Sequence, residues 1–410
     1  MHIQKLTTAD ELFASDHLLA TAFLHPWDEN RAHENVKAQL EGTADTPEET
    51  WGLFSDDDAL VCSISTTRHN YAFGGRALPA GEVHMVGSLP EGRGGGNVRA
   101  LMAEVLRNFK QRGDKIAVLI PFSFAFYRKF GFELAARTLT QRVAIEQLRN
   151  MSCDYKVTRV TSEEDVTVLR ELYDAFALQR NLAELRPEAA WKYTGNGEWG
   201  ERDFFHRDCP RYTYVLWDEA GVAHGYLTFI FVTGEKGPFV GELNVSDFVY
   251  DSPEAFRGLL GFLYRMRAKA THVSFELMDD IDLATLLPEA EQVERKLGGH
   301  AMARLLDVEA VLRAMPHPDG AGSYVLSVED DFMPENSGSY RVSFADGCAT
   351  SVERTDAQAD LCVSEQTLCQ LVIGLIGLDK ARFREGTQLR SNEALLRKVF
   401  VRRDLCLSLR

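Results

Sequence analysis

The sequence has no hydrophobic run long enough to cross a membrane. A membrane-spanning helix needs roughly 18 or more apolar residues in succession. The most apolar stretch here, Leu368 to Leu378, is shorter and carries Gln370 inside it. The N-terminal residues also lack the basic flank and apolar core of a secretory signal. We therefore expect neither a membrane span nor export.

Cysteine is scarce: the chain has seven, and no two of them form a C-x-x-C pair. That absence argues against a zinc ribbon and against a dithiol redox site. An odd number of widely scattered cysteines is typical of reduced thiols in a cytoplasm. The sequence thus predicts a cytoplasmic protein without a metal site.

Basic residues are outnumbered by acidic ones, 45 against 61, which gives a formal net charge of −16. This balance argues against nucleic acid as the main partner. A negative field raises the local concentration of cationic substrates. Acidity is also common among soluble proteins of every kind, so both explanations stay open at this stage.

The chain of 410 residues is long enough for two or three domains. The patterns along it predict three, with the boundaries 1–150, 151–295 and 296–410. The first region contains a capped amphipathic helix, Thr8 to Phe23, followed by strands at Ala59 to Thr66 and Glu82 to Leu89.

The second region begins with a helix whose capping box we place at Thr161 and Glu164. The elements predicted after it are a hairpin, a strand, a helix and a strand, at Tyr212 to Trp217 with Val222 to Val232, Gly241 to Tyr250, Ser252 to Arg267 and Thr271 to Leu277. The third region predicts strands and then helices, at Ser323 to Glu329, Gly338 to Phe344, Cys348 to Arg354, Ser364 to Leu378 and Glu393 to Phe400.

A glycine-rich turn, Pro90 to Arg99, lies between a predicted strand and a clear amphipathic helix. The first turn of a helix leaves several backbone N–H groups unpaired, and the helix dipole adds positive potential there. Glycine lets an anion approach the backbone closely, and Arg93 and Arg99 can add charge. The turn therefore fits a pyrophosphate. The alternative is a surface turn that binds nothing.

Two other phosphate motifs are excluded. The turn has no Gly-Lys-Ser/Thr ending, so it is not a Walker loop. No acidic residue follows an early strand in the manner of a dinucleotide-binding βαβ unit.

A second motif follows the strand Lys115 to Pro121. The pattern F-Y-x-x-F-G-F/Y-E falls on Phe126 to Glu133, and the pattern R-x-x-G-x-G/A falls on Arg93, Gly96 and Val98, although Val98 stands where a small residue is usual. With both motifs in this order, the sequence resembles the GNAT superfamily of acyl-CoA N-acyltransferases. We rely on the pair rather than on either motif alone.

Over essentially its whole length the chain resembles the Eis (enhanced intracellular survival) family. This resemblance implies an α/β fold with mixed α+β sheets, in which two tandem GNAT-like domains precede a sterol carrier protein-like α+β domain. It also implies a homo-oligomer, a hexamer. In the second region the acidic segment Asp251 to Glu254 replaces the glycine turn and would repel a pyrophosphate. We therefore predict one cofactor site per chain.

The resemblance implies acetyl-CoA as the co-substrate. It places the strand end before the glycine turn at the thioester and pantetheine, the turn at the pyrophosphate, and the residues just before the second motif beside the cofactor arm. The implied cofactor-binding residues, with Arg93 added for its charge, are Val86, Gly87, Ser88, Arg93, Gly94, Gly95, Gly96, Asn97, Val98, Arg99, Phe122 and Ser123. Gly87 within a strand independently indicates a bulge or a close approach.

Tyr127 is the candidate general acid, because a phenol with a pKa of about 10 is protonated at neutral pH and can donate to a leaving thiolate. The alternative is a tyrosine that packs in a core between Phe126 and Phe130. The resemblance implies that the C-terminal carboxylate, here on Arg410, acts as general base. A frayed chain end is the alternative for this tail.

Other polar residues are weaker candidates. His84 lies on the strand before the turn and is a possible base, with His69 nearby, although a lone histidine is more often structural. Trp27, Asp28 and Glu29 could face an acceptor amine, but a solvated turn explains them equally.

We predict an acetyl-CoA-dependent N-acetyltransferase that acts directly on an amine, without a covalent enzyme intermediate, because no cysteine lies in either motif. The resemblance implies aminoglycoside-type acceptors or lysine side chains, and the negative charge suits such cations. The alternative is a non-catalytic sensor that binds acyl-CoA or lipid in the third domain, with the helix Ser364 to Leu378 lining a tunnel.

Overall fold

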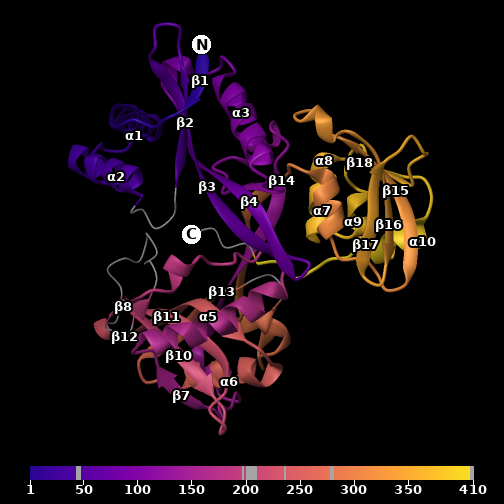
Figure 1. Ribbon diagram of the computed structural model, residues 1–410. Coiled ribbons are helices and arrows are strands. Elements are labelled where there is room, and N and C mark those ends of the chain that lie inside the picture. The colour runs from indigo at the N-terminus through magenta and orange to yellow at the C-terminus, as the bar shows by residue number, and fades with distance from the viewer. Residues whose placement is uncertain (43–47, 196–197, 200–209, 235–236, 278–280, 407–410) are drawn as a thin grey trace. The chain divides into compact units, whose positions relative to one another are not determined.

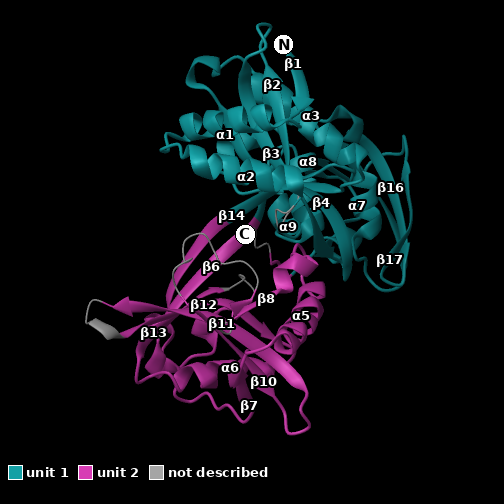
Figure 2. Ribbon diagram, turned by 60° about the vertical axis from the view of Figure 1, so that its left-hand side comes forward, with its two compact units in different colours: residues 1–135, 300–403, 409 teal, residues 136–299, 404–408, 410 magenta. Residues whose placement is uncertain are grey.

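The structure is a computed structural model that describes residues 1–42, 48–195, 198–199, 210–234, 237–277 and 281–406. Its chain divides into two compact units (Figure 2). Of the described residues, unit 1 contains 1–135 and 300–403, and unit 2 contains those within 136–299 together with 404–406. The chain leaves unit 1 within strand β6 (Glu133–Ala144) and returns within strand β14 (Glu294–Leu305).

The first sheet of unit 1 carries the strands predicted near the glycine turn (Figure 1). Its strand order is β1 (His2–Lys5), β2 (Glu49–Phe54), β3 (Leu60–Phe73), β4 (Arg76–Ser88), β5 (Ile116–Leu119) and the end of β14. Only the β4–β5 pair of this set is parallel. β4 begins earlier than the predicted strand Glu82 to Leu89, because it forms a long hairpin with β3.

Helices cover both faces of this sheet (Figure 1). α3 (Asn97–Gln111) buries its apolar stripe against Ile64 and Val83. α1 (Ala9–Phe23) lies on the opposite face, because its Ser15 hydroxyl is hydrogen-bonded at 2.5 Å to Ser63, the neighbour of Ile64 on β3. α2 (Glu29–Glu41) packs on α1. Thr8 caps α1, as the sequence predicts, and it forms a capping box with Glu11.

A second sheet in unit 1 is built from the last third of the chain. Its order is β17 (Cys348–Arg354), β16 (Gly338–Ala345), β15 (Ala321–Glu329), β18 (Leu361–Ser364) and β19 (Gln388–Leu389). The helices of this part are α7 (Val308–Ala314), α8 (Glu365–Ile373), α9 (Leu378–Ala381) and α10 (Glu393–Val399).

The predicted helix Ser364 to Leu378 is wrong in its length. α8 ends at Ile373, because Gly374 adopts a left-handed φ of 86° and caps it. The apolar periodicity continues past this residue into α9, which hides the break in the sequence.

The strands of unit 2 are hydrogen-bonded in the order β6, β13 (Ala270–Leu277), β12 (Gly237–Tyr250), β11 (Ala223–Gly234), β10 (Arg211–Trp217) and β7 (Lys156–Arg159). Two longer helices, α5 (Glu163–Leu178) and α6 (Pro253–Tyr264), pack on them. The predicted hairpin, strand, helix and strand are all present. The capping box of α5 is formed by Ser162 and Asp165, one residue later than predicted.

The mixed parallel and antiparallel sheets with helices on their faces confirm the predicted α/β class. Among the described residues, no helix combines the length and the apolar character needed to span a membrane.

Candidate functional site

Strands β4 and β5 separate within β4, before the glycine turn. β5 pairs with β4 only at Ala80, Gly81 and Glu82 and then ends. β4 continues to Ser88 with β3 alone beside it, so one edge of its backbone is open. The Leu89 N–H donates to the Val61 carbonyl of β3 at 3.2 Å. Because N–H groups alternate sides in an antiparallel ladder, those of Val86 and Ser88 face the open edge.

A bulge and a close helix contact shape this end of β4. The β3–β4 register shifts between Ser63 and Ser65, and Met85 on the facing strand takes a positive φ of 47°. Gly87 lies so near α1 that a Cβ there would come within 2.6 Å of the Leu19 side chain. The sequence indicated one or the other of these features at Gly87. The structure places the close approach at Gly87 and the bulge at Met85.

The glycine turn leaves the start of α3 exposed. Gly94 and Gly96 have φ of 85° and 78°, and a Cβ on either would meet nothing within 4 Å. Gly96 is the N-cap and offers no side-chain acceptor to the first N–H groups of the helix. The Asn97 amide donates to the Gly92 carbonyl at 3.0 Å and closes the turn. The result is an accessible helix N-terminus, which suits an anion.

The two arginines of this region also support the local structure. Arg93 donates to the Ala22 carbonyl at 3.2 Å and to the Ser88 carbonyl at 3.4 Å. Arg99 donates to the Lys129 carbonyl at 3.1 Å, and its guanidinium lies 4.8 Å from the Phe332 ring centre. Both side chains are exposed, so their charge remains available beside the turn.

Tyr127 lies on α4 (Phe124–Arg128), a helix of five residues. Ser123 caps this helix by accepting from the Phe126 N–H. The Tyr127 ring is buried and contacts four phenylalanine rings, those of Phe122, Phe126, Phe130 and Phe132. Burial raises the pKa of the Tyr127 phenol to about 12. The predicted core packing is therefore real, and it keeps the phenol protonated, as an acid role also requires.

Large apolar side chains are exposed around the separated strands. Met85, Ile120 and Phe122 are 46%, 49% and 70% exposed. Acetyl-CoA has an apolar arm with amide groups and an anionic pyrophosphate. The open β4 edge offers donors to the amides, these side chains offer an apolar surface, and the glycine turn offers an anion site. The residues present fit this co-substrate.

Among the weaker candidates, Trp27, Asp28 and His69 have local partners. Trp27 donates to the Asp16 carboxylate of α1 at 2.9 Å, and Asp28 caps α2. Both side chains therefore stabilise these two helices. His69 lies 3.0 Å from the Glu82 carboxylate. His84 is half-buried, and its Nε2 atom is buried without a hydrogen-bond partner.

The C-terminal tail is anchored in unit 2 as far as it is described. Leu405 is buried and forms a parallel bridge with Asn181. The Asn181 N–H donates to the Asp404 carbonyl at 2.9 Å, and the Cys406 N–H donates back to Asn181 at 3.0 Å. Arg410, the predicted base, lies outside the described residues.

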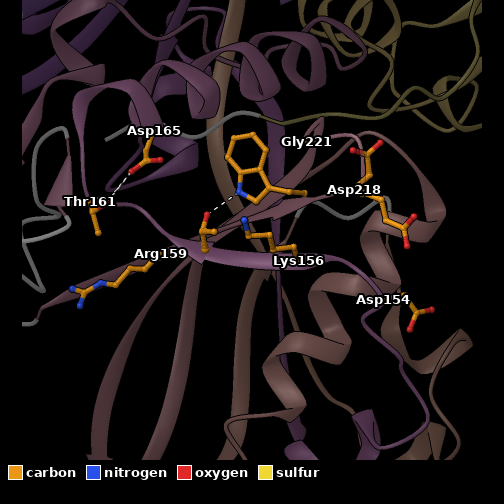
Figure 3. Close-up of a pocket in the computed structure, with 10 residues that line it drawn as sticks. Asp154, Lys156, Arg159, Thr161, Asp165, Asp218 and Gly221 are labelled. Carbon is orange, nitrogen blue, oxygen red and sulfur yellow. Dashed lines mark hydrogen bonds between the residues drawn. The ribbon is translucent and has the colours of Figure 1, made fainter.

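The second domain has no comparable cradle at the matching helix. Ser252 caps α6 with its side chain, Pro253 occupies the first turn, and Asp251 contacts His224 at 2.7 Å. A separate pocket lies beside the edge strand β7 (Figure 3). It is lined by side chains of both charges, including Asp154, Lys156, Arg159, Asp165 and Asp218. A pocket lined in this way lacks the glycine turn and the open helix N-terminus of the first domain.

Family comparison agrees with this geometry. Models of the acetyltransferase (GNAT) domain match residues 3–135 and 183–305, and a model of the sterol carrier protein domain matches residues 308–404. The chain belongs to the GNAT superfamily of N-acetyltransferases. This GNAT protein thus has two acetyltransferase domains in tandem, followed by a sterol carrier protein domain, as its sequence predicts.

Relatives and solved structures extend the likeness of this GNAT protein. An uncharacterised N-acetyltransferase from Streptomyces avermitilis is 25% identical over 374 residues, 86% of each chain. A mycothiol acetyltransferase from Saccharomonospora viridis is 34% identical over 118 residues, 26% of this chain and 38% of that protein.

Two crystal structures share the whole fold. The GCN5-related N-acetyltransferase of Anabaena variabilis matches with a TM-score of 0.81 at 20% identity, covering 99% of this chain and 100% of the other. Eis1 of Mycobacterium abscessus matches with 0.77 at 21% identity, covering 99% of each. The order of the three domains is therefore shared with both of these structures.

Proposed function

We propose that the first GNAT domain transfers the acetyl group of acetyl-CoA directly to an amine of a cationic acceptor. The observation that carries this proposal is the open edge of β4, which runs into the accessible N-terminus of α3. In this proposal the predicted cofactor residues between Val86 and Arg99, with Phe122 and Ser123, hold the co-substrate. Acetyl-CoA supplies an acyl group activated as a thioester.

The open β4 edge would polarise the reacting carbonyl. The N–H groups of Val86 and Ser88 are fixed in a strand. They therefore need no reorganisation when negative charge develops on the carbonyl oxygen of the thioester. The bulge at Met85 turns the strand at this point. Both effects come from backbone geometry and not from a titrating side chain.

Tyr127 would act on the departing sulfur. Its phenol, with a pKa of about 12, stays protonated across the physiological range. As the amine nitrogen bonds to the acyl carbon and the carbon–sulfur bond breaks, the phenol O–H donates a hydrogen bond to the departing sulfur and then transfers its proton to it. The high pKa also means that the phenolate regains its proton readily.

The attacking amine must lose a proton before or during the attack, and we assign this proton to the C-terminal carboxylate of Arg410. The anchoring of Leu405 and Cys406 to Asn181 fixes the chain shortly before that residue. Shortening the chain by Arg410 alone tests the assignment, because it removes the side chain and moves the carboxylate back by one residue.

We propose aminoglycoside-type amines or lysine side chains as acceptors, the classes that the resemblance to the Eis family implies. The net charge of −16 suits such cations, because a negative field raises their local concentration. We further propose that the protein is a homo-hexamer in the cytoplasm. Within each chain we propose three domains, at residues 1–150, 151–295 and 296–410. Light scattering in solution tests the assembly.

A thiol-release assay with acetyl-CoA and a panel of amines tests the function. Turnover with a cationic amine is the expected result. Tight binding of acetyl-CoA without turnover on any amine would instead favour the sensor. The packing of α8 is evidence against a lipid tunnel in the third domain. Its apolar side chains are all at most 1% exposed and form part of an ordinary core: Leu368, Leu371, Val372 and Ile373.

A further inference from the structure

The helix that carries Tyr127 is too short to be stable by itself. α4 has five residues, Phe124–Arg128, whereas isolated helices shorter than about 12 residues are marginal in water. Its N-terminus has the Ser123 cap. Besides the packing of its ring against the phenylalanines, the position of the Tyr127 backbone therefore depends on contacts made by the chain that follows the helix.

Two glutamine side chains of α8 bind that following segment. The Gln366 amide donates to the Arg128 carbonyl at 3.1 Å and to the Phe132 carbonyl at 3.4 Å. The Gln370 amide donates to the Leu134 carbonyl at 2.9 Å. These carbonyls belong to the F-Y-x-x-F-G-F-E motif and to the residue after it, while the donors belong to the sterol carrier protein domain.

Arg304 also contacts this segment. Its guanidinium is fully buried, pairs with Asp330 at 2.6 Å and also donates to the Phe130 carbonyl. Gly131 has a φ of 82°, and a Cβ there would lie 2.6 Å from the Arg304 guanidinium. The glycine of the motif is thus required by a positive φ and by the close approach of Arg304.

The last residue of the motif completes the contact. Glu133 binds Arg128 at 2.8 Å and Arg384 at 2.7 Å, and it accepts from the Leu134 N–H at 2.8 Å. Burial alone would raise the pKa of Glu133, but these hydrogen bonds outweigh burial and lower it. The carboxylate therefore stays ionised and links the end of α4 to the third domain.

We propose that α8 acts as a brace for the acetyl-transfer site, with Gln366 as the positioning residue that fixes the turn behind Tyr127. The sterol carrier protein domain then serves the transfer reaction through Tyr127 and not by carrying a lipid. This inference rests on the proposed role of Tyr127 as general acid.

Two substitutions remove the Gln366 donor while keeping the length of the side chain. Gln366→Met keeps the shape without polarity, and Gln366→Glu keeps an oxygen but cannot donate to a carbonyl. Gln366 is half-buried at the rim of α8, so neither change leaves a cavity. We expect each to lower kcat by about 10-fold or more, because small misplacements of a reacting group are costly. Gln358→Met, at an exposed position of the same domain, is the matched control and keeps wild-type kcat.

Three readouts separate positioning from general damage. The dissociation constant of coenzyme A, measured by calorimetry, and the melting temperature stay near their wild-type values. The alkaline limb of the kcat profile moves to lower pH, because a less buried Tyr127 phenol loses part of the rise in its pKa. In a Tyr127→Phe background, Gln366→Met has no further effect on kcat, because both changes act on one group.

The outcomes distinguish the two proposals. If Tyr127→Phe is slow and both Gln366 variants keep wild-type kcat, the brace is overturned and the proposed function stands. If Gln366→Met slows the Tyr127→Phe enzyme by its full factor, the brace does not act through Tyr127 and is overturned. If Tyr127→Phe keeps full activity, the acid assignment and the brace both fail.

Discussion

The Glu133 carboxylate binds the Arg384 guanidinium at 2.7 Å, although 251 residues separate them in the chain. Glu133 ends the motif that contains Tyr127, and Arg384 follows α9 in the sterol carrier protein domain. Glu133 belongs to the motif of the candidate catalytic residue, but its carboxylate forms a structural ion pair between the first and the last domain within unit 1.

Arg384→Met should lower the free energy of unfolding by about 1–3 kcal/mol, because it removes a charged donor from a carboxylate that is 2% exposed. Arg382→Met is the control: Arg382 pairs with Glu393, but both side chains are nearly half exposed, so it should cost under about 1 kcal/mol. Urea unfolding of both variants measures the difference. Equal costs would show that the Glu133 contact adds no special stability.

Glu365→Gln should change the pH dependence of stability. Burial raises the pKa of Glu365 to about 8 from a usual 4.5. Between these values the unfolded chain has lost the proton and the folded chain keeps it, so wild-type stability falls as pH rises, by up to about 1.4 kcal/mol per unit. Glutamine has no such proton to lose.

The stability of Glu365→Gln relative to wild type should therefore increase from pH 5 to pH 8 and then level off. Urea unfolding at several pH values measures this. Glu385→Gln, at an exposed position of the same domain, should follow the wild-type curve. Parallel curves for Glu365→Gln and wild type would contradict the raised pKa.

Tyr127→Phe should lower kcat by about 100-fold, within the usual range for losing a general acid. The dissociation constant of coenzyme A should not change, because the ring and its four phenylalanine contacts remain. Steady-state kinetics and calorimetry on the same preparation check both parts. Weaker coenzyme A binding with unchanged kcat would point to a binding role instead.

Gly96→Ala should weaken coenzyme A binding about 10-fold, because a methyl group would stand at the open N-terminus of α3. Gly113→Ala is a matched control near the other end of the same helix. Both glycines have a positive φ, 78° and 97°, and both have open space around a Cβ. Each change should therefore cost roughly 1–2 kcal/mol of stability through backbone strain, but only Gly96→Ala should affect binding. Equal binding by the two variants would remove the glycine turn from the cofactor site.

Calorimetric titration should give one coenzyme A per chain. The start of α6 is occupied by the Ser252 cap and lies beside Asp251 and Glu254, which disfavour a pyrophosphate. Ser252→Gly should leave this stoichiometry unchanged, because the acidic side chains remain. A value of two would place a second site in the second domain.

The order of elements around the glycine turn could be predicted because the signals are local. The apolar spacing from Val98 to Phe109 and the Thr8 cap depend on residues within a few positions of each other. The end of α8 could not be predicted, since apolar residues continue on both sides of Gly374. The bulge at Met85 was also missed, because a positive φ on a methionine follows from the strand register and not from the residue type.

The sequence by itself determined the superfamily, the α/β class and the position of the two motifs, because these depend on short patterns of glycine, aromatic and apolar residues. Only the tertiary structure decided what supports the turn behind Tyr127. Gln366, Arg304 and Arg384 are ordinary polar residues in their own segments. They gain their role only when folding brings their donors to the carbonyl and carboxylate groups of this turn, because buried polar groups are stabilised by hydrogen-bond partners.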